Sequence, residues 1–162
     1  MEIRKDSPDR KPVRKLLQDY IAASRATHPA HAPYVLDIEA LIEPGVTFWS
    51  ASQGELVAGC IAMKELGNRQ AEIKSLCVDP SFRGRGIGRM LVDTLIADAR
   101  RLGLSELLLE TGNMEFYEAA RQLYASFDFE PCGPFADYAD DPVSRFMRLD
   151  LSQNKMNNKA TS

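Results

Sequence analysis

The sequence predicts a single α/β domain in which helices flank a mixed, mostly antiparallel sheet. The chain has 162 residues, 44% of them hydrophobic, which is enough for one sizeable core and too few for two comfortable domains. Residues 46–51 and 56–64 are strand-like runs joined by a short turn, as in an antiparallel hairpin. Residues 74–111 follow the order strand, glycine-rich turn, helix and strand.

Two helices are predicted ahead of the hairpin. Apolar residues recur at three- and four-residue intervals from Val13 to Ile21, which indicates an amphipathic helix. A loop rich in helix breakers follows at residues 27–33. Apolar residues at 35–42 then indicate a second, shorter helix that ends at Pro44-Gly45.

A third strand and a longer helix follow the hairpin. Residues 71–78 form the predicted strand, which Asp79-Pro80 ends because proline cannot donate to a β-ladder. From Ile87 to Leu102 apolar residues recur at helical spacing, and Gly103 stops the helix.

The last part of the chain is predicted to hold a strand, a helix and a closing strand. The apolar run at residues 107–109 is typical of a strand buried on both faces. The predicted helix then covers residues 118–126, and the predicted closing strand covers residues 145–151. Residues 152–162 are polar and non-periodic, so we expect a disordered tail after one domain at 1–151.

Composition and charge argue against several classes of partner and site, namely nucleic acid, a membrane, disulfides and zinc. Twenty Lys and Arg against 23 Asp and Glu give a formal charge of −3, so no nucleic-acid partner is expected. Apolar runs are far shorter than the ~20 residues of a membrane helix, and the start lacks a signal peptide's apolar stretch. We therefore expect a cytoplasmic chain with no membrane contact. Cys60, Cys77 and Cys132 have no disulfide or zinc-knuckle spacing and are expected to be reduced.

The turn Arg83-Gly-Arg-Gly-Ile-Gly88 joins a predicted strand to a predicted helix. Unpaired amides at a helix start can face an anion, and the helix dipole favours negative charge there. A tight connection without a ligand is the alternative. The glycine spacing fits neither a dinucleotide fingerprint nor a P-loop. Glu110 at a strand end nevertheless keeps a dinucleotide-binding oxidoreductase open as an alternative.

The turn and its flanks resemble the GCN5-related N-acetyltransferase (GNAT) family, whose signature is Arg or Gln, two residues, Gly, one residue, then Gly or Ala. Arg83, Gly86 and Gly88 match this signature. Residues 71–80 resemble the family's preceding strand, and 120–129 resemble its later Ala-x-x-Leu-Tyr-x-x-x-Gly-Phe motif. The resemblance is clear over residues 46–129 and implies the family's acyl-CoA acyltransferase fold.

The resemblance also implies acetyl-coenzyme A (acetyl-CoA) as co-substrate, with no metal required. In the family, backbone amides of the signature loop hold the pyrophosphate, and the end of the preceding strand pairs with the pantetheine arm. Carried over, the phosphate-binding residues are Arg83, Gly84, Arg85, Gly86, Ile87 and Gly88. Cys77 and Val78 would bind pantetheine, and a backbone amide near Val78 would stabilise the oxyanion. For Arg83 and Arg85 the alternative is a pair of solvated loop cations.

Two residues match catalytic positions of the family. Tyr124 matches the tyrosine that protonates the departing thiolate, and a core tyrosine with a satisfied hydroxyl is the alternative. Glu72 matches a strand position where some members place a general base for the acceptor ammonium. A glutamate on the solvent face of a strand is the alternative for Glu72.

The sequence departs from the family pattern at two positions. Tyr117 stands where the family often has an asparagine that contacts pantetheine, and Asn113 is the candidate to replace it. Asp128 occupies the usual glycine position of the later motif. Because aspartate tolerates left-handed backbone better than most residues, we expect this turn to survive.

The loop before the last predicted strand is acidic and aromatic. In the family such loops border the acceptor cleft, and carboxylates with aromatic rings suit a cationic amine. The acceptor-binding candidates are Phe135, Asp137, Tyr138, Asp140 and Asp141, with a hydrated acidic loop as the alternative. His28 and His31 are expected near the acceptor entrance and not at a metal.

The resemblance thus implies an N-acetyltransferase that transfers the acetyl group of acetyl-CoA to a primary amine by direct attack in a ternary complex. A non-catalytic acyl-CoA sensor on the same fold and the oxidoreductase are the alternatives. The acceptor it implies is a primary amine of either a small molecule or a protein. The sequence leaves the oligomeric state open, a homodimer included.

Overall fold

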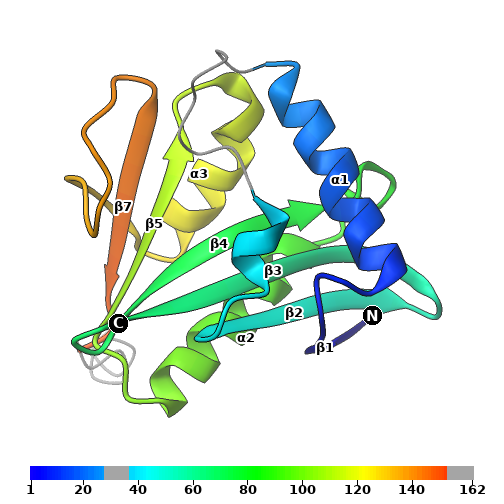
Figure 1. Cartoon of the computed structure of the whole chain (residues 1–162), viewed down its shortest axis with the longest axis horizontal. Coiled ribbons are helices and arrows are strands. Elements are labelled where there is room, and N and C mark those ends of the chain that lie inside the picture. The colour runs from blue at the N-terminus through cyan, green and yellow to red at the C-terminus, as the bar shows by residue number, and fades with distance from the viewer. Residues whose placement is uncertain (28–36, 153–162) are drawn as a thin grey trace.

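The computed structural model describes residues 1–27 and 37–152, which form one sheet with helices on both faces (Figure 1). The strands are β1 (Glu2–Lys5), β2 (Val46–Gln53), β3 (Leu56–Gly67), β4 (Gln70–Val78), β5 (Glu106–Gly112), β6 (Glu130–Cys132) and β7 (Ser144–Asp150). The α-helices are α1 (Lys11–Arg25), α2 (Ile87–Arg101) and α3 (Glu118–Ser126), and the 3-10 helices are η1 (Ile38–Leu41), η2 (Pro80–Phe82) and η3 (Glu115–Tyr117). The strand order is β1-β2-β3-β4-β5-β7-β6.

The predicted fold class is confirmed. Neighbouring strands pair antiparallel, except β4 and β5, which are parallel and are connected through α2. The left-handed backbone expected at Asp128 is present, with φ 73°. The short strands β1 and β6 were not predicted, because segments of four and three residues carry too little periodicity.

The second predicted helix is shorter than expected. Its described part is η1, and Asp37 caps the start of η1 because its side chain accepts a hydrogen bond from the Glu39 amide. It stops before Pro44, since proline disfavours helical backbone in the residue before it. His28, His31 and the tail residues 153–162 lie outside the described residues.

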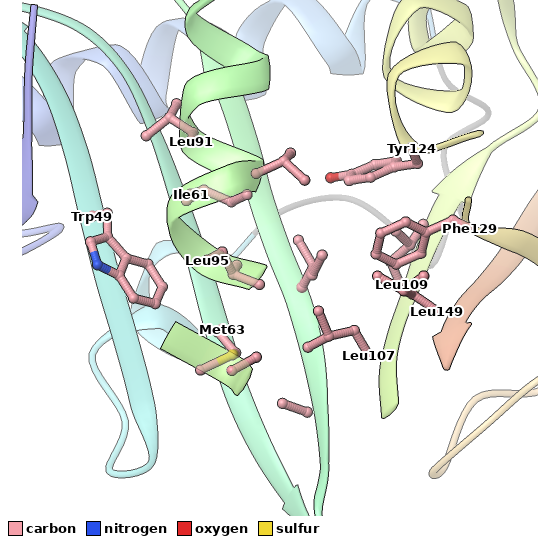
Figure 2. Packing of buried hydrophobic residues seen from close by; sticks show 14 of the residues in the cluster. Trp49, Ile61, Met63, Leu91, Leu95, Leu107, Leu109, Tyr124, Phe129 and Leu149 are labelled. Atoms are coloured by element: carbon pink, nitrogen blue, oxygen red, sulfur yellow. The ribbon is translucent and has the colours of Figure 1, made fainter. Parts of the chain in front are cut away.

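Side chains alternate between the two sheet faces, so each face has its own apolar core. The face covered by α2 and α3, here the α2/α3 face, has a core that includes Trp49, Ile61, Leu91, Leu95 and Tyr124 (Figure 2). The face covered by α1 and η1, here the α1 face, has a core that includes Val13, Leu17, Leu41, Cys60 and Cys77.

A β-bulge interrupts β4 near its middle. Cys60 lies opposite Cys77 and Ala62 opposite Lys74, so two steps along β3 match three along β4. Ser75 lies in this extra stretch and has a φ of 53°, as bulged strands allow.

Strands β4 and β5 stay together over only part of their lengths. They pair from Gln70 with Glu106 to Ile73 with Leu109, and no further register is formed between them in the described residues. The rest of each strand diverges, which Figure 1 shows as an opening between β4 and β5. The sheet therefore has a gap in its middle, at the carboxyl ends of two parallel strands.

A partly buried carboxylate anchors the start of α1. Asp6 accepts hydrogen bonds from Arg10 and from the Ser50 hydroxyl, the latter at 2.6 Å. Burial raises the pKa of Asp6, but these hydrogen bonds and that from the Ser7 amide outweigh it, so the pKa falls from 3.8 to about 2. The ionised form is therefore favoured in the folded state.

We expect Asp6→Asn to lower the free energy of unfolding by about 2 kcal/mol at pH 7. Because the folded-state pKa is depressed, this contribution is present above pH 4 and is lost as pH falls through about 2. Urea unfolding at several pH values measures it. Asp9→Asn removes only an exposed ion pair with Arg14 and should cost less than about 1 kcal/mol. An Asp6→Asn deficit that is equal at pH 2 and pH 7 would contradict this account.

Candidate active site

A cavity of about 170 Å³ occupies the gap between β4 and β5. Its lining comes from both strands, from α1 and η1 on one face, and from α3 and the loop before β7. The polar or aromatic residues that line it are Tyr20, Asp37, Glu72, Lys74, Ser75, Glu110, Thr111, Tyr117, Tyr124 and Tyr138. The carboxyl ends of parallel strands are where α/β sheets usually bind ligands.

The strand alternation assigns these side chains to opposite faces. Ile73 and Leu109 belong to the core of the α2/α3 face, so their neighbours Glu72, Lys74 and Glu110 project toward the α1 face. Tyr124 belongs to the α2/α3 core and reaches the same cavity from the other side. The cavity therefore connects the two faces.

Glu72 is a buried carboxylate, with 5% of its surface exposed. The alternative of a solvent-facing strand glutamate is therefore wrong. The Tyr138 hydroxyl donates to Glu72 Oε2 at 2.5 Å, and Lys74 Nζ lies 3.9 Å from Oε1. Burial raises the pKa of Glu72, while the hydrogen bond from Tyr138 and the charges of Lys74 and Lys64 oppose that rise. A raised pKa makes the carboxylate a stronger base than a surface glutamate.

Glu110 is a second carboxylate on the same side of the cavity. It is half-buried, and Ser144 Oγ donates to its Oε2 at 2.9 Å. Burial raises the pKa of Glu110, and the negative charges of Glu72 and Asp141 raise it further. The sequence had placed Glu110 only in the oxidoreductase alternative, whereas the structure places it beside Glu72.

Tyr124 is buried, with its ring 5.4 Å from that of Phe129. Figure 2 shows the hydroxyl oxygen pointing away from α3 toward the middle of the sheet. Burial raises the pKa of Tyr124 above its ordinary value. The phenol therefore stays protonated at neutral pH and keeps a proton to donate.

The end of β4 presents backbone groups to the gap. The Asp79 amide donates to the Ala58 carbonyl of β3 at 2.8 Å, so the Val78 amide points to the opposite edge of β4, where β5 has separated. The Cys77 side chain points into the α1 core, where burial raises its pKa. Any contact of Cys77 with the cofactor would therefore be made by its backbone.

The glycine-rich turn ends in an open helix N-terminus. Gly84 and Gly86 have φ values of 77° and 75°, which side chains disfavour. Gly86 is the N-cap of α2 and makes no side-chain cap, so the first amides of α2 are left for another acceptor. Arg85 lies over the Phe82 ring at 5.1 Å, and Gly88 faces Leu123 of α3.

The acidic loop is only partly directed into the cavity. Tyr138 lines the cavity and lies 5.2 Å from the Phe135 ring. Asp137 and Asp140 are exposed. Asp141 accepts a hydrogen bond from the Val143 amide and is close enough to raise the pKa of Glu110.

Asn113 follows β5 and is tied to the loop before β7. Its side-chain amide donates to the Pro142 carbonyl at 3.2 Å, and its backbone amide donates to Val143. A role for Asn113 in cofactor binding stays a prediction. Arg121 of α3, which the sequence did not single out, donates to the carbonyls of Gly112 and Met114 and fixes the loop after β5.

The residues that the structure describes hold neither a group of metal ligands nor a helix that could span a membrane. Over residues 1–27 and 37–152, no three His, Cys, Asp or Glu side chains are grouped to hold a metal ion. In the same ranges, every helix is too short or too polar to cross a membrane.

Known proteins resemble this chain over most of its length. The profile of the acetyltransferase (GNAT) family matches residues 13–129. The uncharacterized N-acetyltransferase YsnE of Bacillus subtilis is 40% identical over 151 residues, which are 93% of this chain and 100% of YsnE. The structure of an acyl-CoA N-acyltransferase from Klebsiella pneumoniae has a TM-score of 0.77 and 26% identity, covering 93% of this chain and 97% of that one.

A more distant structure, that of a Bacillus subtilis acetyltransferase in complex with CoA, has a TM-score of 0.69 and 20% identity, covering 93% of this chain and 98% of that one. The family profile spans the signature turn, the cavity strands and the later tyrosine motif. The resemblance seen in the sequence is thereby confirmed. The chain belongs to the acetyltransferase (GNAT) family.

Proposed function

We propose that the protein transfers the acetyl group of acetyl-CoA to a primary amine by direct attack in a ternary complex. The observation that carries this proposal is the cavity through the sheet, which Tyr124 enters from the α2/α3 face and Glu72 from the α1 face. A donor and an acceptor that approach from opposite faces would meet between a proton donor and a proton acceptor.

The described residues fit a CoA thioester. The open amides at the start of α2 suit a diphosphate, and the unpaired edge of β4 suits the amide groups of a pantetheine arm. Ser75 Oγ is a buried cavity atom without a hydrogen-bond partner among the described residues. The CoA bound by the related Bacillus subtilis acetyltransferase supports the same donor class.

Two side chains and one backbone amide then each have a defined task. Glu72 accepts a proton from the acceptor ammonium, directly or through water, which frees the amine to attack the thioester carbonyl. The Val78 amide stabilises the oxyanion that develops as the N–C bond forms. Tyr124 gives its proton to the departing thiolate as the C–S bond breaks. The attacking nitrogen loses its second proton to solvent as the amide forms, and solvent reprotonates the phenol.

Two measurements test this function against its alternatives. Acetyl-CoA, and not NAD, should raise the melting temperature of the chain, whereas a dinucleotide-binding oxidoreductase would respond to NAD. Release of free thiol across a panel of amines should then distinguish an enzyme from a sensor that binds acetyl-CoA without turnover. Acetyl-CoA binding with no thiol release above hydrolysis for any amine would favour the sensor.

Tyr138→Phe should move the acidic limb of the pH–rate profile to higher pH by roughly one unit. The Tyr138 hydroxyl lowers the pKa of Glu72 and so opposes the effect of burial. Its loss therefore raises the pKa of Glu72, and the base ionises only at higher pH. The profile of kcat/KM from pH 5 to 9 measures this shift. Phe135→Leu, which alters the same aromatic contact without touching Glu72, should leave the limb in place. An unmoved limb in Tyr138→Phe would exclude Glu72 as the titrating base.

A further inference from the structure

Lys74 has a distinct place in the cavity. It lies on β4 between Glu72 and the bulge at Ser75 and projects toward the α1 face, the side proposed for the acceptor. Of the described residues that line the cavity, Lys74 is the only one with a cationic side chain, and that side chain is 22% exposed. The proposed chemistry gives this cation no task.

Lys74 is held only loosely by its neighbour. Its Nζ is 3.9 Å from Glu72 Oε1, whereas Tyr138 donates to Glu72 Oε2 at 2.5 Å. Because Tyr138 already donates a hydrogen bond to the buried carboxylate, Lys74 can turn to another anion without leaving Glu72 unpaired. Lysine is suited to such an exchange, since its ammonium is a point charge on a flexible chain.

The surrounding charges define which acceptor would fit. Glu72 and Glu110 suit an ammonium group, and Lys74 beside them suits an anion, all within a small cavity. An α-amino acid has only three covalent bonds between its ammonium nitrogen and a carboxylate oxygen, which suits the 3.9 Å between Lys74 Nζ and Glu72 Oε1. A polyamine or a lysine-rich peptide would instead place a second cation against Lys74.

We propose that Lys74 is a carboxylate-binding residue and that the acceptor is a small amine bearing a carboxylate next to it, as in a free amino acid. This inference rests on the proposed function. It adds a specificity determinant to the cavity, and the side-chain end of the acceptor would face the tyrosine rings of Tyr20 and Tyr117.

The test compares acceptors that differ only in the carboxylate. Leucine, methionine, phenylalanine and threonine are each paired with the amino alcohol of the same side chain, whose amine is of similar basicity. Spermidine and a lysine-containing peptide complete the panel. Thiol release gives kcat and KM for each, with mass spectrometry of the acetylated product.

We expect at least one amino acid to exceed its amino alcohol tenfold or more in kcat/KM. Lys74→Met should reduce that preference to less than threefold by raising KM for the acid, and Lys74→Arg should keep most of it. Lys64→Met is the matched control, because Lys64 lies opposite Glu72 on β3, pairs with Glu43 and does not line the cavity. Its preference should match that of the wild type.

Three results would overturn the inference. They are equal use of acid and alcohol, an equal loss for both in Lys74→Met, and acetylation of no amino acid by a chain that binds acetyl-CoA. Calorimetry with acetyl-CoA, read together with thiol release over the whole panel, separates these from failure of the proposed function. A chain that does not bind acetyl-CoA, or that binds it and acetylates no amine, would contradict that function. A chain that binds it and acetylates only spermidine or the peptide would contradict the role of Lys74 alone.

Discussion

Gly86→Val is expected to abolish the stabilisation of the folded chain by acetyl-CoA. Gly86 has a φ of 75°, and an added Cβ would meet nothing within 4 Å, so the cost lies in the backbone and not in a clash. A β-branched residue resists this left-handed conformation, and relaxation of the loop would turn the first amides of α2 away from a diphosphate. Calorimetry and thermal shift with acetyl-CoA measure the loss.

Gly67→Val is the matched control for Gly86→Val. Gly67 also has a positive φ, of 88°, and open space around its Cβ, but it lies beside the other end of β4. It should cost comparable folding stability and leave acetyl-CoA affinity unchanged. Gly86→Ala provides a milder variant if the valine chain does not fold. Cofactor binding of wild-type strength in a folded Gly86→Val chain would exclude the turn as the phosphate site.

Tyr124→Phe should lower kcat by roughly ten- to a thousandfold while leaving acetyl-CoA affinity unchanged. The substitution removes only the hydroxyl, and the ring keeps its packing against Phe129. Because burial raises the pKa of Tyr124, the wild-type phenol stays protonated throughout the working pH range, as the proposed proton donor must.

The thermal stability of Tyr124→Phe separates catalysis from packing. A melting temperature near that of the wild type with reduced turnover assigns the hydroxyl to the chemistry. Turnover equal to that of the wild type would make Tyr124 a core residue of the α2/α3 face and nothing more.

Local patterns predicted the elements that carry the signature. The apolar spacing from residue 87 predicted α2, and 118–126 coincides with α3. These elements are fixed by local signals, namely helical periodicity, glycines with positive φ and proline stops. The order of these elements also carried the resemblance to the GNAT family.

The composition of the cavity depends on contacts that no local pattern contains. Tyr138 and Glu72 are 66 residues apart, and their hydrogen bond forms only because the loop before β7 folds over β4. The burial of Glu72 and the position of Lys74 likewise depend on which strand face the gap exposes. Alternation along β4 could have placed Glu72 and Lys74 on one face, but the bulge at Ser75 made the direction of later residues unreadable from sequence.

The short contact between β4 and β5 has a mechanical consequence. In the described residues the ladder between β4 and β5 has four residue pairs, so the two parts of the sheet, β1–β4 and β5–β7, share a narrow seam. A strand edge left open inside a sheet is normally paired or covered. A ligand lying along that edge would bridge the two parts as an additional strand does. The same molecule that reacts in the gap would thereby couple the two parts and make their unfolding more cooperative.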